Sequence, residues 1–103
     1  MSRSRITTKA SRRIRPHPGE VLREECLVPL GMSARQLASI LDVPANRISD
    51  LVREKRSMTA DTALRLAQHL GTTAQFWLNL QTSHDLSKAE AATDYSRIPR
   101  RAA

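Results

Sequence analysis

The stretch LASILDVPANRISDLVREKR, residues 37–56, carries the strongest structural signal in the chain. Its apolar residues recur at helical spacing, stop once at residues 42–44, and resume with fewer apolar positions. Two helices that meet at a steep angle over one core produce such a pattern, because each needs only a narrow buried stripe. The first predicted stripe is Leu37, Ala38 and Leu41, and the second is Ile48, Leu51 and Val52, with Val43 filling the turn between them.

The remaining surface of the second helix carries mainly small and polar side chains. A helix that enters the major groove needs little bulk near its N-terminus, and amide or guanidinium groups that pair with base edges. We therefore interpret this segment as a recognition helix. Its expected base-reading residues are Ala45, Asn46, Arg47, Ser49 and Arg53. An ordinary solvated helix face is the alternative for these residues, and the acidic Asp50 beside them favours DNA only if it accepts from a cytosine amino group.

Cap signals predict further helices on both sides of this pair. Ser33 with Gln36 forms a capping box, and Thr59 caps a helix whose first turn contains Asp61. Thr72 with Gln75 and the apolar residues Phe76, Trp77 and Leu80 indicate a last helix packed on the core. No segment alternates as a half-buried strand does. The predicted class is all-α, with five helices over residues 18–27, 33–41, 44–54, 59–70 and 73–82, the first ended by Pro29 and Gly31.

The net charge of +7 lies mostly outside these helices. Residues 1–15 contain six Arg or Lys and no acid, whereas residues 16–85 contain seven basic and eight acidic residues. An arm with so few large apolar residues does not offset its own ordering entropy, so we expect it to be disordered. We divide the chain into a basic arm over residues 1–15, one domain over residues 16–86 and a flexible tail over residues 87–103.

The sequence indicates neither catalysis nor metal binding. Its single thiol, Cys26, belongs to no zinc-binding or disulfide pattern. His17, His69 and His84 lack the spacing to Ser, Cys or carboxylates that builds a nucleophile or a metal site. No apolar run is long enough for a signal peptide or a membrane span. We expect a cytoplasmic protein that is not an enzyme and needs no cofactor.

A wider series of motifs resembles the HigA-type antitoxins of the phage-repressor-like (XRE) helix-turn-helix family. The motifs are HPGEVL (17–22), PLG (29–31), VP (43–44), RI (47–48), KR (55–56), TADTALRLA (59–67) and FWLNLQ (76–81). The resemblance covers about residues 16 to 86 and implies a five-helix phage-repressor-like domain with flexible termini. It also implies an antitoxin that binds operator DNA, represses its own operon and neutralises a HigB-type mRNA endonuclease. A free-standing transcriptional regulator and a protein-interaction module without DNA binding are the alternatives.

The implied partners are double-stranded operator DNA, a HigB-type toxin and a second copy of the chain, with no membrane. The operator of a dimer should be an inverted repeat with half-sites about one helical turn apart. The residues expected at DNA phosphates are Ser33, Arg35, Gln36, Lys55 and Arg56. The expected dimer contacts are Leu78 and residues 81–86. Because an RNase toxin should be basic, Glu20, Glu24 and Glu25 are candidate toxin contacts, with a solvated helix face as the alternative.

Two positions depart from the family pattern. Asp42 stands in the turn where relatives usually have Gly, although Asp tolerates the left-handed conformation expected there. Glu54 stands where relatives commonly have Gly before Lys55. We therefore expect the recognition helix to run slightly further than in relatives, which would bring a negative charge near the DNA backbone.

Overall fold

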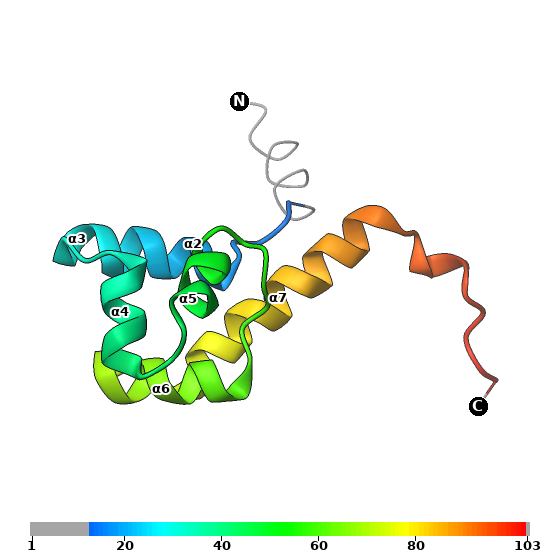
Figure 1. The fold of residues 1–103 in the computed structure, drawn as a ribbon. Coiled ribbons are helices and arrows are strands. Elements are labelled where there is room, and N and C mark those ends of the chain that lie inside the picture. Colours follow the sequence, from blue (N-terminus) through cyan, green and yellow to red (C-terminus); the bar gives the residue numbers. More distant parts are fainter. Residues whose placement is uncertain (1–12, 103) are drawn as a thin grey trace, which may run out of the picture.

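The structure is a computed structural model that describes residues 13–102 (Figure 1). All regular elements in this range are helical, which confirms the predicted all-α class. They are α2 (Pro18–Leu22), the π-helical turn η1 (Arg23–Leu27), α3 (Val28–Leu30), α4 (Ala34–Leu41), α5 (Ala45–Val52), α6 (Ala60–Leu70), α7 (Ala74–Ala92) and the 3₁₀ turn η2 (Tyr95–Arg97). None of the helices in this range is both long and apolar enough to cross a membrane.

The first helical run is longer than expected, because Pro29 does not end it. Helical structure continues through η1 and α3, and Gly31 ends it in the left-handed conformation at φ 61°. Proline has no N–H and its ring crowds the carbonyl one turn earlier. The backbone widens into a π turn before Pro29, in which the Val28 N–H donates to the Arg23 carbonyl. A proline that was read as a stop signal is therefore accommodated by a local bulge.

The helix pair α4 and α5 forms as predicted. Ser33 Oγ accepts from the Gln36 backbone N–H, and the Gln36 side chain accepts in return from the Ser33 N–H, so the capping box is confirmed. Asp42 adopts the left-handed conformation at φ 60°, and the chain turns through residues 42–44 into α5. Leu37, Ala38 and Leu41 on α4 and Ile48 and Leu51 on α5 are all buried.

The expected extension of the recognition helix past Val52 is wrong. Helix α5 ends at Val52 and Glu54 takes a left-handed conformation at φ 63°. The Glu54 and Lys55 N–H groups then donate to the carbonyls of Leu51 and Asp50, which are among the last acceptors of the helix. The glutamate is thus held in the conformation that a glycine would adopt more easily.

Helices α6 and α7 complete the domain. Thr59 caps α6 as predicted, but Thr73 rather than Thr72 caps α7 by accepting from the Phe76 N–H. Thr72 instead accepts a hydrogen bond from the indole Nε1 of Trp77 at 2.7 Å. Trp77 is buried in the core, whereas Phe76 is 42% exposed, so its predicted core position is wrong. The two rings meet edge to face with their centroids 5.0 Å apart, so the indole fills the core and the phenyl ring packs beside it.

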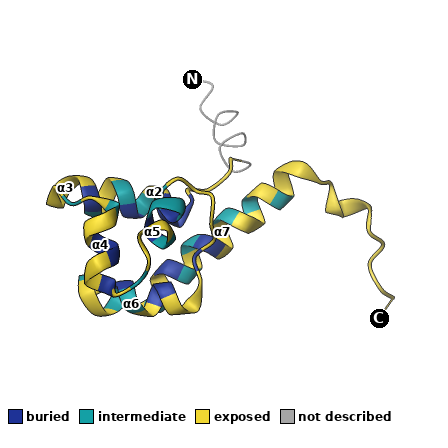
Figure 2. Ribbon diagram, in the orientation of Figure 1, coloured by how far each residue is buried: buried dark blue, intermediate teal, exposed yellow. Residues whose placement is uncertain are grey.

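Helix α7 extends ten residues beyond its expected end at Thr82 and finishes at Ala92. Its first half packs on α2 and α6, while its second half projects from the domain and is mainly exposed (Figure 2). The segment expected to be a flexible tail therefore begins as helix over residues 87–92. Of the basic arm, residues 1–12 lie outside the described range. Arg15 lies against α7, because its N–H donates to Ser87 Oγ and its carbonyl contacts His84 Nδ1.

Candidate DNA-binding interface

Helix α5 is held by its apolar stripe and leaves its polar face outward. Ile48 and Leu51 are fully buried and anchor the helix in the core. Ala45, Asn46 and Arg53, three of the predicted base-reading residues, are exposed, and Ser49 is half-buried. Because the first two residues of the helix, Ala45 and Asn46, have small or short side chains, its N-terminal end has room to approach the floor of a groove.

Arg47 differs from the other four predicted base-reading residues, because it already has a partner. Its Nη1 donates to Oδ2 of Asp61 in the first turn of α6, and only 29% of its side chain is exposed. The same carboxylate oxygen accepts from Nε of Arg65 at 2.9 Å. Hydrogen bonds from Arg65 and then from Arg47 lower the pKa of Asp61 below its usual value. Asp61 is therefore an ionised acceptor shared by two arginines from two helices.

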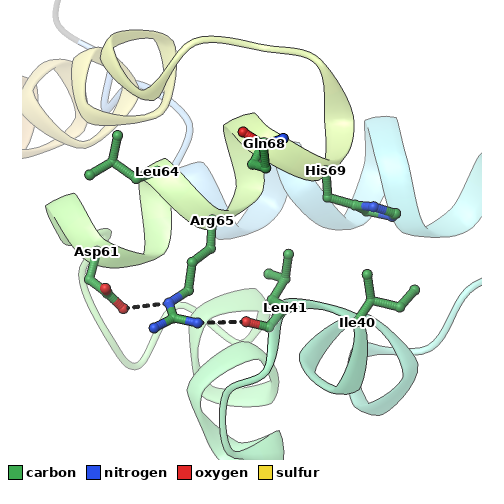
Figure 3. Close-up of a pocket in the computed structure, with 7 residues that line it drawn as sticks. All are labelled: Ile40, Leu41, Asp61, Leu64, Arg65, Gln68 and His69. Atoms are coloured by element: carbon green, nitrogen blue, oxygen red, sulfur yellow. Dashed lines mark hydrogen bonds and ion pairs between the residues drawn. The ribbon is translucent and has the colours of Figure 1, made fainter.

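Arg65 links this carboxylate to the turn between α4 and α5 (Figure 3). Its Nη1 donates to the Leu41 carbonyl at 2.8 Å and lies 3.4 Å from the Asp42 carbonyl. The Leu41 carbonyl is at the C-terminal end of α4, where a helix lacks internal donors and favours a positive charge. A side chain from α6 thus stabilises the turn that sets the direction of α5.

A second arginine stabilises the other end of α5. Arg23 of the first helical run donates from Nη1 to the Val52 carbonyl at 2.5 Å. Gly19, one turn earlier, lies so close to α5 that a Cβ there would be 1.8 Å from the Leu51 carbonyl oxygen. Close backbone packing and an arginine cap therefore connect α2 and η1 to the end of the recognition helix.

The predicted phosphate-binding residues lie at two places beside α5. Ser33, Arg35 and Gln36 are exposed at the start of α4, and the side chains of Ser33 and Gln36 are engaged in the capping box. Lys55 and Arg56 are exposed in the loop after α5, with Arg56 Nη2 3.9 Å from Asp50 Oδ2. The contact of these five residues with DNA stays a prediction.

A polar pocket of about 190 Å³ separates this loop from α7. His17 and His84 meet there edge to face, with ring centroids 5.0 Å apart, beside Lys55 and Arg56. Burial, and next the neighbouring His84, lower the pKa of His17. On the same side, Gln81 of α7 accepts from the backbone N–H of Met58 at 2.7 Å. The loop that carries two predicted phosphate contacts is therefore held by α7.

Sequence reasoning missed Asp61, Arg65 and Arg23 as parts of this interface. Asp61 was interpreted only as an acid that favours the start of α6. Its spacing of four residues from Arg65 indicates an ion pair on one helix face, which was a usable signal. Its contact with Arg47, and the contact of Arg23 with Val52, depend on how distant helices pack and have no signature along the chain.

Comparison with known proteins places the chain in one family. Residues 22–77 match the family model described as helix-turn-helix. Virulence-associated protein I of Dichelobacter nodosus is 58% identical over 74 residues, which cover 72% of this chain and 68% of that protein. The antitoxin HigA of Pseudomonas aeruginosa, solved with the higBA promoter, is 47% identical with a TM-score of 0.73, over 75% of this chain and 84% of that one.

The antitoxin GraA, solved in complex with its operator, is 42% identical with a TM-score of 0.78, over 86% of this chain and 93% of that one. Both proteins were solved with promoter or operator DNA. These matches and the capped α4–α5 geometry show that the chain belongs to the helix-turn-helix family, in the phage-repressor-like (XRE) group that contains the HigA antitoxins.

Proposed function

We propose that this chain is the antitoxin of a type II toxin–antitoxin pair, which binds its own operator and represses the operon. The main observation in support is the outward polar face of α5. The helix is anchored by a buried stripe, by Arg23 at its C-terminal end, and by Arg65 and the left-handed Asp42 in the turn before it. The HigA and GraA structures, both solved with promoter or operator DNA, support the same role for α5 in this chain.

Operator binding is tested with a duplex from the promoter upstream of the gene that encodes this chain, against a random duplex of equal length. The wild-type protein should prefer the promoter duplex. Arg53→Ala and Arg47→Ala should each weaken promoter binding by about 1 to 3 kcal/mol, because each removes a side chain that is predicted to contact base edges. Arg97→Ala, which removes a cation beyond α7, is the control. If both α5 variants bind as the wild type does, another surface reads the DNA.

The toxin partner is tested by co-expression with the neighbouring open reading frame. Growth arrest by that product alone, relieved when this chain is present, supports the antitoxin function. A gene without a toxic neighbour, together with promoter binding, favours the free-standing regulator instead.

We propose the acidic side chains of the first helical run as the toxin contact. Glu20, Glu24 and Glu25 are exposed, and Glu24 pairs with Arg23 at 3.0 Å. A basic RNase would be attracted to this surface. Lysine substitution of all three should abolish toxin capture, whereas Glu90→Lys on the outer half of α7 should not. If the triple variant captured the toxin as well as the wild type does, these acids would be an ordinary solvated helix face with no part in toxin binding.

The dimer contact is best assigned to the outer half of α7. The sequence predicted Leu78 and residues 81–86 as dimer contacts. Leu78 is half-buried against the core of its own domain and Gln81 is buried, so both offer little free surface to a partner. Leu86 is 59% exposed on the projecting helix. Sedimentation at tens of micromolar should show a dimer, and Leu86→Lys should shift it toward monomer. A wild-type protein that stays monomeric with and without DNA contradicts this assignment.

A further inference from the structure

We propose that Asp61, which lies outside the recognition helix, is a positioning residue that sets the sequence specificity of Arg47. This inference rests on the proposed operator binding and deepens it. Arg47 donates through Nη1 to Asp61 Oδ2, and Asp61 is itself fixed by Nε of Arg65. Arg65 in turn donates to the Leu41 carbonyl, so the chain of contacts ends on the backbone of α4 (Figure 3).

The arrangement restricts a side chain that is otherwise free to rotate. An arginine on a helix surface has several rotatable bonds and loses much conformational entropy when it is fixed against a ligand. Arg47 is held before DNA arrives, because one of its five donors is occupied by the carboxylate. Four donors remain, and two parallel N–H groups are enough for the O6 and N7 edge of a guanine. A restrained guanidinium approaches that edge in one orientation.

If Asp61 does not position Arg47, its negative charge should weaken DNA binding instead of supporting it. Asp61 is 57% exposed in its side chain and lies in the first turn of α6, where it contacts Arg47 of the predicted recognition helix. A free acid there would repel phosphates, and its removal would strengthen binding to every duplex. The two roles therefore predict changes of opposite sign in the affinity for specific DNA.

The test compares Asp61→Ala, Arg47→Ala and the double variant on the promoter duplex and on the random duplex. Asp61→Ala should lower promoter affinity on the order of tenfold and leave affinity for the random duplex equal or higher. The same change in an Arg47→Ala background should lower promoter affinity no further, because the orienting contact is already absent. Glu54→Gln, which removes an exposed acid from the loop after α5, should raise affinity for both duplexes.

A second measurement is the base preference at each position of the half-site, obtained by selecting bound duplexes from a pool of half-site variants. The wild-type protein should prefer guanine at one half-site position, and Asp61→Ala and Arg47→Ala should both lose that preference. Circular dichroism and thermal melts verify that each variant is folded. A promoter affinity that rises in Asp61→Ala, or a guanine preference that survives it, overturns the positioning role and leaves the proposed function intact. A wild-type protein with no preference for the promoter duplex overturns both.

Discussion

The Gln81 side chain on α7 accepts a hydrogen bond from the backbone N–H of Met58, 23 residues earlier in the chain, at 2.7 Å. Both residues are buried, and the Gln81 Nε2 donates to Asp85 at 2.9 Å. A buried N–H without an acceptor is costly, so this contact satisfies the backbone where the loop after α5 enters the core. Helix α7 carries none of the predicted base-reading residues, but through Gln81 it helps to hold the loop that is expected to contact phosphates.

Gln81→Leu should reduce the free energy of unfolding by about 1 to 3 kcal/mol, because it leaves the Met58 N–H buried without an acceptor. Denaturant unfolding measures the loss. Gln75→Leu is the matched control, since Gln75 is exposed on the same helix and bonds only to Asn79. Equal stability of the two variants would mean that water replaces the Gln81 oxygen.

Gly19→Ala should destabilise the domain by about 3 kcal/mol or more. The alanine Cβ would overlap the Leu51 carbonyl oxygen and force α2 away from α5. Glu20→Ala, at the adjacent exposed position, should change little. Thermal melts compare the two variants. A Gly19→Ala protein with wild-type stability would show that α2 and α5 are packed less closely than the structure has them.

Glu54→Gly should raise the free energy of unfolding by about 1 kcal/mol, because glycine adopts the left-handed conformation without the Cβ clash that costs an L-residue. Glu54→Ala removes the same charge and keeps the strain, so its stability should stay near that of the wild type. Chemical denaturation of all three proteins separates the backbone effect from the charge effect. If Glu54→Ala raised the free energy of unfolding as much as Glu54→Gly does, the stabilisation would come from removing the charge and not from the backbone conformation.

His17 should make stability depend on pH in mildly acidic solution. Its Nδ1 accepts from the Gly19 N–H at 2.9 Å, and burial lowers its pKa in the folded state, so the ring is held neutral. The unfolded chain, with a histidine pKa of about 6.5, binds a proton more readily than the folded one. Stability should therefore be full above that pH and decline as the pH falls toward the folded-state pKa. His17→Asn, which keeps an acceptor for the cap, should flatten this decline in a series of melts from neutral to acidic pH.

The basic arm should strengthen binding to any duplex without changing specificity. Arg15 is held at α7 by Ser87 and His84, beside the pocket that also contains Lys55 and Arg56. Deleting residues 1–12 should reduce the slope of log affinity against log salt by ~0.9 for each lost phosphate contact, with the ratio of promoter to random affinity nearly constant. Glutamine at Arg3, Arg5, Lys9 and Arg12 keeps the length and should act like the deletion.

An unchanged salt slope after the deletion would show that the arm is an unselected tail. If the deletion instead abolished the preference for the promoter duplex over the random duplex, the arm would be shown to read a groove, as homeodomain arms do.

The local elements of this protein follow from its sequence, because caps and apolar spacing act over a few residues. Ser33 and Thr59 start their helices as predicted, Asp42 makes the turn, and Ile48 and Leu51 define the buried side of α5. The polar face of α5 follows from that stripe by the geometry of a helix. The family could also be inferred, since its motifs are local and occur in order.

Tertiary packing decided the rest, because it brings together groups that no short-range pattern relates. Whether Glu54 would extend α5 depended on its surroundings, and packing placed it in a conformation that its own preference disfavours. Phe76 and Trp77 have similar apolar character, and only the shape of the core selected the indole. The base-reading role of Arg47 was predicted from its position on the polar face of the helix. Asp61 lies 14 residues away in the chain, and only the packing of α6 beside α5 brings its carboxylate to Arg47.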